Sequence, residues 1–283
     1  MQNQRTLARA IQYSGIGVHS GAQVTIRLLP AAPQTGVVFV RTDIAGAPEI
    51  NATVDCIAPD TLMRQTTLRH AGRPEAQVAT VEHLMACLHG FGVDNCRVEI
   101  NGPEAPFQDG SARDLAEAIT AAGTAEQALP RRYYFVPTPI AYSDGDVEIV
   151  ATPGKGLRLT FFLDYPGTMI GRQALSLVMT PESFQSEIAP ARTFCLKQEI
   201  EYLKQKGLIK GGTPDMALIV DGDHLLNSDP TLRFKDEFVR HKILDLMGDL
   251  YLMGRPIQGH ILAVKSGHAS HARFVSLLKQ QAS

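Results

Sequence analysis

The sequence has 283 residues, of which 44% are hydrophobic and 20% are charged, and its formal net charge at pH 7 is −2. This composition is typical of a globular protein and excludes an intrinsically disordered chain. The pI near 6.5 argues against a nucleic-acid-binding protein. No apolar run approaches the roughly 20 residues of a membrane-spanning helix.

The chain start and the cysteines indicate the compartment. The first stretch, MQNQRTLARAIQYSG, contains no apolar signal core, so we expect a cytoplasmic protein. The four cysteines are scattered without a CxxC pair, which favours free thiols over disulfides or a thiolate metal site.

The first half of the chain is expected to begin with short strands and to continue with helices. Apolar, β-branched stretches predict strands over 22–30, 35–43 and 96–101. Helices are predicted from Thr80 to Gly90 or Gly92, and from an N-cap at Ser111 to Gly123. A polar stretch with a proline, residues 125–132, predicts a domain boundary, which divides the chain into 1–127 and 128–283.

The second half repeats this order of strands and then helices. Strands are predicted over 132–142, 144–153, 156–166, 216–221 and 259–266, and helices over 181–189, 197–207, 237–250 and 268–281. Both halves therefore predict an α+β fold, with two similar sheet-plus-helix domains. No convincing sequence repeat accompanies this similarity.

One side of the helix expected at residues 237–250 carries residues that could bind a metal ion. His241, Asp245 and Asp249 lie in one narrow arc at about 100° per residue, with Lys242 at its edge. An imidazole and a carboxylate four positions apart can hold one ion together. The solvent-facing side of an ordinary amphipathic helix has the same pattern, so this pair alone does not decide between a site and a surface.

Two further segments carry candidates for acid–base chemistry. Glu82 and His83 are adjacent near a helix start and point about 100° apart, as a base and a metal ligand on one wall of a cleft would. His268 follows a strand end and a glycine, which suits a general acid. His271 lies one turn further into that helix and is the weaker candidate. Each feature alone is also common on surfaces without function.

Taken together, these residues are the parts of a hydrolytic zinc site. Two neutral histidines and one carboxylate leave a coordination position open, while a separate Glu and a separate His serve as base and acid. His83 and His241 are 158 positions apart (241 − 83) and fall in different expected domains, so the site is expected at the domain interface. The glycine-rich stretches 15–21 and 208–215 match no nucleotide-binding motif and are interpreted as turns.

Five segments in order resemble one bacterial family over nearly the whole chain. They are TVEHLMACLHGFGVDN, EAPFQDGSA, ARTF, FKDEFVRHKILDLMGDL and KSGHA. Together they resemble the UDP-3-O-acyl-N-acetylglucosamine deacetylases, zinc amidases that commit a sugar nucleotide to lipid A synthesis. The resemblance implies that His83, His241 and Asp245 bind zinc. It also implies that Glu82 is the general base and that His268 is the general acid.

The resemblance extends to further positions of the site. It implies that Asp249 orients or charges His268, that the Thr193 hydroxyl polarises the amide carbonyl, and that Phe194 and Lys242 contact substrate. It also implies that an insert at about 195–220 forms an apolar passage for the fatty acyl chain. The residues of this insert that could line such a groove are Ile200, Leu203, Leu208 and Ile209.

The expected activity is hydrolysis of the N-acetyl group of UDP-3-O-(3-hydroxyacyl)-N-acetylglucosamine, with Zn²⁺ as cofactor. The chain has no length for a fused dehydratase, so deacetylation alone is expected. We expect a monomer with a UDP-acyl-aminosugar substrate and no nucleic-acid partner. No integral membrane segment is expected, and peripheral membrane contact is left open. Two alternatives remain: a zinc amidase of the same fold with another acetylated substrate, and a non-catalytic zinc-binding module.

Overall fold

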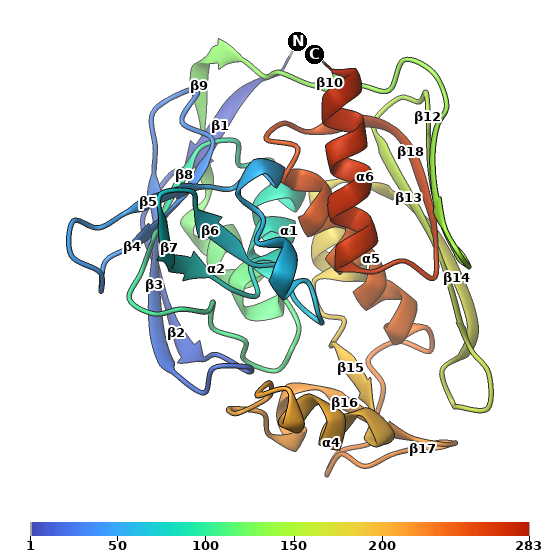
Figure 1. The fold of residues 1–283 in the computed structure, drawn as a ribbon. Helices are drawn as coiled ribbons and strands as arrows, with labels where there is room; N and C mark the ends of the chain where they lie inside the picture. The colour runs from blue at the N-terminus through green and yellow to red at the C-terminus, as the bar shows by residue number, and fades with distance from the viewer. Residues whose placement is uncertain (1, 283) are drawn as a thin grey trace.

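The structure, a computed structural model, describes residues 2–282 and confirms the α+β prediction. Two large sheets lie at opposite sides of the molecule, and four helices fill the space between them (Figure 1). These helices are α1 (Glu82–Gly90), α2 (Arg113–Ala122), α5 (Glu237–Tyr251) and α6 (His268–Gln281). No helix among the described residues is long and apolar enough to cross a membrane.

The first sheet has the strand order β2-β3-β8-β4-β5. Its strands are β2 (Ile11–Ile16), β3 (Gln23–Pro30), β4 (Val37–Arg41), β5 (Glu49–Asn51) and β8 (Cys96–Ile100). Within this sheet, as far as residues 2–282 show, the pair β4–β8 is parallel and the other pairs are antiparallel. Phe39, Leu28 and Val98 are fully buried on this sheet.

The second sheet has the order β11-β12-β18-β13-β14, and β10 pairs with β18 outside this path. Its strands are β10 (Tyr134–Phe135), β11 (Ile140–Asp144), β12 (Val147–Thr152), β13 (Leu157–Tyr165), β14 (Gly171–Met179) and β18 (Ile257–Val264). The pairs β13–β18 and β10–β18 are parallel. Buried and half-buried residues alternate along β18, as a strand with one core-facing side requires.

The two sheets share one topology. In each, an antiparallel hairpin is followed by two further strands, and a later strand enters the middle of the sheet, antiparallel to one neighbour and parallel to the other. A helix precedes this central strand and another follows it: α1 and α2 flank β8, and α5 and α6 flank β18. The similarity of the two halves predicted from element order is therefore present in the strand order itself.

Small sheets complete the fold. They are β1 (Asn3–Leu7) with β9 (Thr124–Pro130), β6 (Leu68–His70) with β7 (Arg73–Val78), and β15 (Phe194–Leu196) with β16 (Leu218–Asp221) and β17 (His224–Leu225). The last of these, together with α4 (Lys197–Gln205), forms a separate small layer at the bottom of Figure 1. The short helix α3 (Pro181–Ser183) continues into a π-helical turn at Phe184–Ile188, where a helix was predicted.

Several sequence-based expectations need correction. Residues 124–130, in the polar stretch at the expected domain boundary, form strand β9, which was not predicted and pairs with β1, and the boundary at 127/128 stays a prediction. Strand β14 was not predicted, because its residues alternate between half-buried and exposed and none is fully buried. The N-cap of α2 is Ala112 rather than Ser111. All four cysteines are free, as predicted.

The helices α1 and α5 touch at a glycine. A Cβ atom at Gly248 would collide with the carbonyl oxygen of Glu82. Only a glycine therefore allows α5 to approach the first turn of α1 this closely. The contact lies between Asp245 and Asp249 in sequence, so it brings both aspartates next to Glu82 and His83.

Candidate active site

The three predicted metal ligands meet where α1 crosses α5. His83 Nε2 lies 3.6 Å from Asp245 Oδ1, and His241 Nε2 lies 3.3 Å from the same oxygen. Ligand atoms about 2.0–2.1 Å from a tetrahedral zinc ion are separated by about 3.3 Å. The donor set and its spacing therefore fit zinc, and His83, His241 and Asp245 form one of two groups of potential metal ligands among the described residues.

The protonation states of this group also suit metal binding. Burial lowers the pKa of His241 to about 4, so its imidazole is neutral near pH 7. The Nδ1–H of His241 donates to the carbonyl of Ala191 at 3.1 Å, which leaves Nε2 directed at the ligand group. Burial alone would raise the pKa of Asp245, but Lys242 and His241 outweigh it and hold the pKa well below its usual range.

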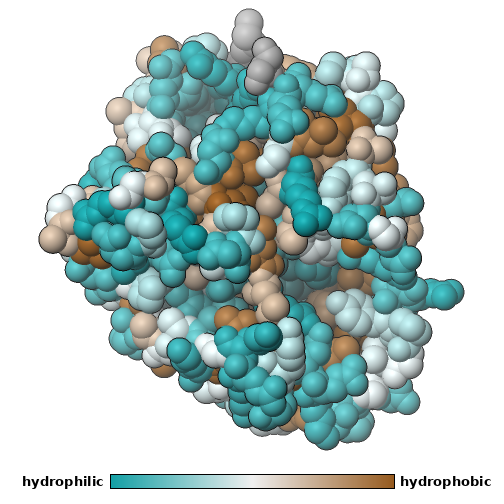
Figure 2. Space-filling view, viewed as in Figure 1, coloured by the Kyte–Doolittle hydropathy of each residue, from teal (hydrophilic) through white to brown (hydrophobic). Residues whose placement is uncertain are grey.

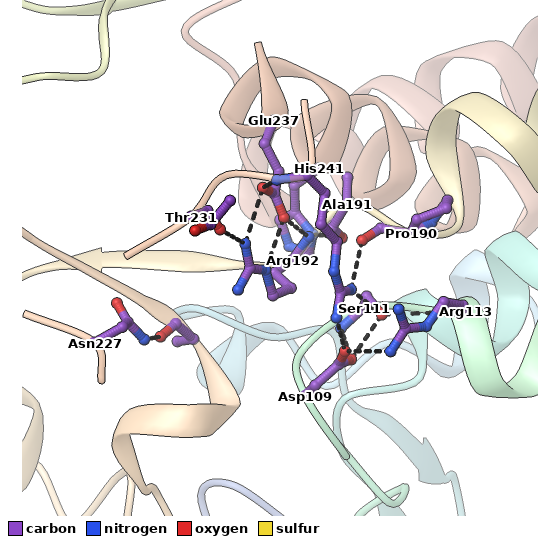
Figure 3. Close-up of polar contacts among 12 residues, drawn as sticks. Asp109, Ser111, Arg113, Pro190, Ala191, Arg192, Asn227, Thr231, Glu237 and His241 are labelled. Carbon is purple, nitrogen blue, oxygen red and sulfur yellow. Dashed lines mark hydrogen bonds and ion pairs between the residues drawn. The ribbon is translucent and has the colours of Figure 1, made fainter. Parts of the chain in front are cut away.

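A buried ion pair fixes the segment that supplies the Ala191 carbonyl. Glu237, in the first turn of α5, is fully buried and accepts bonds from the backbone N–H and the guanidinium of Arg192. Figure 3 shows Arg192 between Glu237 and Thr231, with His241 pointing toward Ala191. The ion pair therefore ties the segment before Thr193 to the helix that carries two of the metal ligands. Sequence reasoning did not identify Arg192 or Glu237.

Lys242 lies on the rim of the metal-ligand group. Its ammonium donates to Asp245 Oδ2 at 2.8 Å and lies 6.0 Å from the centre of the Phe161 ring. Burial lowers the pKa of Lys242, but the Asp245 carboxylate more than compensates, so the net shift is upward and the ammonium stays charged. Lys242 also lines a cavity beside this group, where a cation is available to an anionic ligand.

Glu82 is buried beside the metal ligands. Its side chain is almost inaccessible, and Oε2 accepts the backbone N–H of Thr66 at 3.0 Å. Burial raises the pKa of Glu82 to about 7, because the ionised carboxylate loses hydration there. A carboxylate with a pKa near 7 is suited to general base catalysis.

His268 stands opposite Glu82, with Nε2 3.9 Å from Glu82 Oε1. Its other ring nitrogen, Nδ1, donates to Asp249 Oδ2 at 2.8 Å. Burial lowers the pKa of His268, but Asp249 and Glu82 outweigh it and raise the pKa to about 9. His268 is therefore protonated near pH 7, as a general acid must be. The pairing of Asp249 with His268, implied by the resemblance, is present in the geometry.

Asp249 has more partners than were predicted. The Thr66 hydroxyl donates to Oδ1 at 2.6 Å, and His271 Nδ1 donates to Oδ2 at 2.7 Å. Burial alone would raise the pKa of Asp249, but His268 and then His271 outweigh it and hold the pKa well below its usual range. Sequence reasoning missed Thr66 and ranked His271 below His268. The three-residue spacing of the two histidines on one helix was the signal available.

A cavity of about 590 Å³ opens onto this group. Of the predicted site residues, its walls include His241, Asp245, His268, Lys242, Thr193 and Phe194. Its other walls include the insert residues Leu203 and Ile209, whereas Ile200 and Leu208 are not among its lining residues. Figure 2 shows a hollow near the centre of this face, above the insert, with hydrophobic side chains around it.

The glycine-rich turns meet at the same cavity. Gly211 N donates to the carbonyl of Val18, and Lys210 N donates to that of His19. A Cβ at Gly211 would crowd Gly17 O, so the two turns pack backbone to backbone. His19 lines the cavity, which sequence reasoning did not anticipate.

Comparison with known proteins identifies the family. The sequence profile described as UDP-3-O-acyl N-acetylglycosamine deacetylase matches residues 4–280. The UDP-3-O-acyl-N-acetylglucosamine deacetylase of Myxococcus xanthus is 45% identical over 273 residues, covering 96% of this chain and 85% of that protein. The enzyme of the same name from Nitratidesulfovibrio vulgaris is 43% identical over 281 residues, covering 99% and 89%. The one from Bdellovibrio bacteriovorus is 41% identical over 265 residues, covering 94% and 86%. The chain therefore belongs to the UDP-3-O-acyl-N-acetylglucosamine deacetylase family.

Proposed function

We propose that this protein is a zinc-dependent deacetylase. It hydrolyses the N-acetyl group of UDP-3-O-(3-hydroxyacyl)-N-acetylglucosamine to the free amine and acetate, the committed step of lipid A synthesis, in the cytoplasm. The observation that carries the proposal is the meeting of His83, His241 and Asp245 with the buried Glu82 and His268. The two imidazole nitrogens lie 3.6 and 3.3 Å from Asp245 Oδ1, and His268 Nε2 lies 3.9 Å from Glu82 Oε1. A closed structural zinc site needs neither a base nor an acid, which argues against a non-catalytic zinc module.

The ligand chemistry supports zinc in particular. Two imidazoles and one carboxylate are a set used by catalytic zinc sites, which keep one coordination position for water or substrate, and His83, His241 and Asp245 would hold the ion here. When bound, the ion would polarise the amide carbonyl and lower the pKa of a water molecule. Asp245 contributes one oxygen to this group while its second oxygen is held by Lys242.

Two residues of the chain carry out the two proton transfers. Glu82, whose pKa lies near 7, takes a proton from the attacking water. His268 donates its Nε2 proton to the departing glucosamine nitrogen, while Asp249 stabilises the imidazolium through Nδ1. The hydroxyl of Thr193, on the cavity wall, donates a hydrogen bond to the oxyanion that develops on the carbonyl oxygen.

The cavity suits a substrate with an anionic and an apolar part. Lys242 places a buried ammonium at the cavity, and Phe194 offers an aromatic ring there. Toward the insert, the cavity is lined by Leu203, Ile209 and Ala217, which supports a passage for the fatty acyl chain through this side.

Acetate release tests the proposal. The zinc-loaded protein should release acetate from the acylated sugar nucleotide, and a chelator should abolish release until zinc is restored. Release from another acetylated compound, but not from this substrate, would favour the zinc amidase with a changed substrate. No release from any acetylated sugar, with zinc bound, would favour the non-catalytic module.

A further inference from the structure

His271 is a buried histidine beside the site to which the function proposed above gives no role. His271 is completely inaccessible to solvent and lies on α6, three residues after His268. Its Nδ1 meets Asp249 Oδ2 at 2.7 Å, and its Nε2 meets the Ser266 hydroxyl at 2.9 Å. The ring stands edge-on to that of His268, with the ring centres 6.1 Å apart.

The hydrogen-bonding partners define the tautomer of His271. Asp249 is ionised and can only accept, so Nδ1 of His271 carries the hydrogen and donates it. Burial lowers the pKa of His271, so the ring is neutral and Nε2 accepts the hydrogen of Ser266. Ser266 lies between β18 and α6, and its hydroxyl therefore fixes the ring from the side opposite to Asp249.

These three residues are spaced as hydrogen-bonding partners rather than as metal ligands. Asp249, His268 and His271 do form the second group of potential ligands among the described residues. The two nitrogens, however, lie only 2.7 and 2.8 Å from Asp249 Oδ2, whereas ligand atoms around a tetrahedral zinc ion are about 3.3 Å apart. One carboxylate oxygen therefore accepts two imidazole N–H groups.

We propose that His271 is a positioning residue for the deacetylation: its Nδ1–H bonds the same Asp249 oxygen as His268 and so limits how strongly this carboxylate binds the His268 ring. This proposal rests on the function proposed above. Thr66 and His268 also hold Asp249, so the carboxylate stays in place when His271 is removed. The remaining effect is electrostatic, because Oδ2 then offers all of its negative charge to His268.

The sign of the effect follows from the groups around the two rings. The groups that act on His268 are Asp249, Glu82, Asp245, His19 and His271, and those that act on His271 are Asp249, Lys242 and His268. A substitution at position 271 leaves the other charges unchanged. Loss of the competing donor strengthens the bond between Asp249 and His268, so the pKa of His268 rises and the ring becomes a weaker acid.

Two substitutions separate the hydrogen bond from the packing. His271→Leu removes the donor and keeps the volume roughly constant, while His271→Asn places an amide N–H close to the position of Nδ1. For the zinc-loaded His271→Leu enzyme, we expect the basic limb of the kcat profile to move up by roughly one pH unit. We also expect kcat to fall about tenfold with little change in KM. His271→Asn should restore the limb and most of kcat.

His89→Leu is the matched control. It removes another buried imidazole at the contact of α1 and α5, one that bonds the Met247 carbonyl and no site residue. His89→Leu should lower the free energy of unfolding without shifting the basic limb of the kcat profile. An unmoved or lowered limb in His271→Leu would overturn the proposal, and so would a His271→Asn enzyme as impaired as His271→Leu.

Proton NMR provides a readout that does not depend on turnover. The zinc-loaded protein should show two imidazole N–H signals at the far-downfield position of carboxylate-bonded groups, from His268 and His271. His271→Leu should keep only one of these two, shifted further downfield. A spectrum without the His271 signal in the unsubstituted protein would overturn the positioning role. If the protein shows both signals but releases no acetate, the deacetylase function fails while the hydrogen-bond assignment stands.

Discussion

Two clusters of histidine and aspartate lie one turn apart along α5, and they differ in spacing and charge. In the Asp245 cluster, the imidazole nitrogens stand 3.3 and 3.6 Å from the carboxylate oxygen. In the Asp249 cluster, the corresponding distances are 2.8 and 2.7 Å. The spacing in the Asp245 cluster leaves room for an ion between the ligand atoms, whereas the distances in the Asp249 cluster are those of direct hydrogen bonds.

The electrostatics separate the clusters in the same way. Burial lowers the pKa of His241 to about 4, so its imidazole is neutral near pH 7. Burial acts on His268 in the same direction, but Asp249 and Glu82 outweigh it and raise the pKa to about 9. The two histidines thus acquire opposite protonation states, because His241 faces a carboxylate that Lys242 also bonds, whereas His268 faces two carboxylates, Asp249 and Glu82. We infer that one cluster holds the ion and that the other moves the proton.

The largest effect is expected when the carboxylate of the Asp245 cluster is removed. Asp245→Ala removes one of three ligands, so zinc occupancy should fall strongly. Activity should drop on the order of 10³-fold or more, since the ion supplies several kcal/mol to the transition state. Metal analysis of the purified protein, with Asp249→Asn as the matched variant, measures this. Unchanged zinc content in Asp245→Ala would remove Asp245 from the ligand set.

Glu82 lies between the two clusters, and its substitution should lower turnover without changing the zinc content. Glu82→Gln keeps the shape of the side chain and an oxygen for the Thr66 N–H, so the fold and the zinc content should persist. Turnover should fall about 10²- to 10⁴-fold, the usual contribution of a general base. Steady-state kinetics together with metal analysis test this. A variant with less than a tenfold loss would argue that another group accepts the proton.

The comparison also explains what sequence could reveal. The i, i+4 spacing along residues 237–250 placed His241, Asp245 and Asp249 on one face, because helical periodicity alone decides this. Helical periodicity does not show which distant segment of the chain packs beside this face. Thr66, 183 positions from Asp249, is linked to it only through tertiary structure. The same holds for the Ala191 carbonyl that orients His241.

The fold shows the same division between local and long-range information. The main helices were predicted because their apolar periodicity is local. Strand β14 was missed because it lies at a sheet edge without a fully buried position, so its sequence lacks the signal of a core strand. Residues 124–130 have a polar, linker-like composition, and they form a strand because β1 supplies the partner.

The charge of Asp249 should set the pH range of activity. Asp249→Asn removes the main group that raises the pKa of His268, so the basic limb of the kcat/KM profile should move from near pH 9 to lower pH. The expected movement is roughly one to three pH units. Turnover near pH 7 should fall about 10- to 100-fold, less than the whole contribution of a general acid. Asp223→Asn, at an exposed turn, is the control. An unchanged basic limb would mean that Asp249 does not set the pKa of His268.

The smallest effect is expected at the hydroxyl that supports Asp249 from the other side. Thr66→Val removes the donor to Oδ1 and should cost about 1–3 kcal/mol of stability and a few-fold of turnover, because a buried charged acceptor loses one partner. The neighbouring Thr67 is equally buried, yet its hydroxyl has no hydrogen-bond partner among residues 2–282. Thr67→Val should therefore be neutral or stabilising, since it removes an unsatisfied polar atom at nearly constant shape. Thermal unfolding of both variants measures the difference. Equal destabilisation would mean that the cost at Thr66 comes from packing rather than from its bond to Asp249.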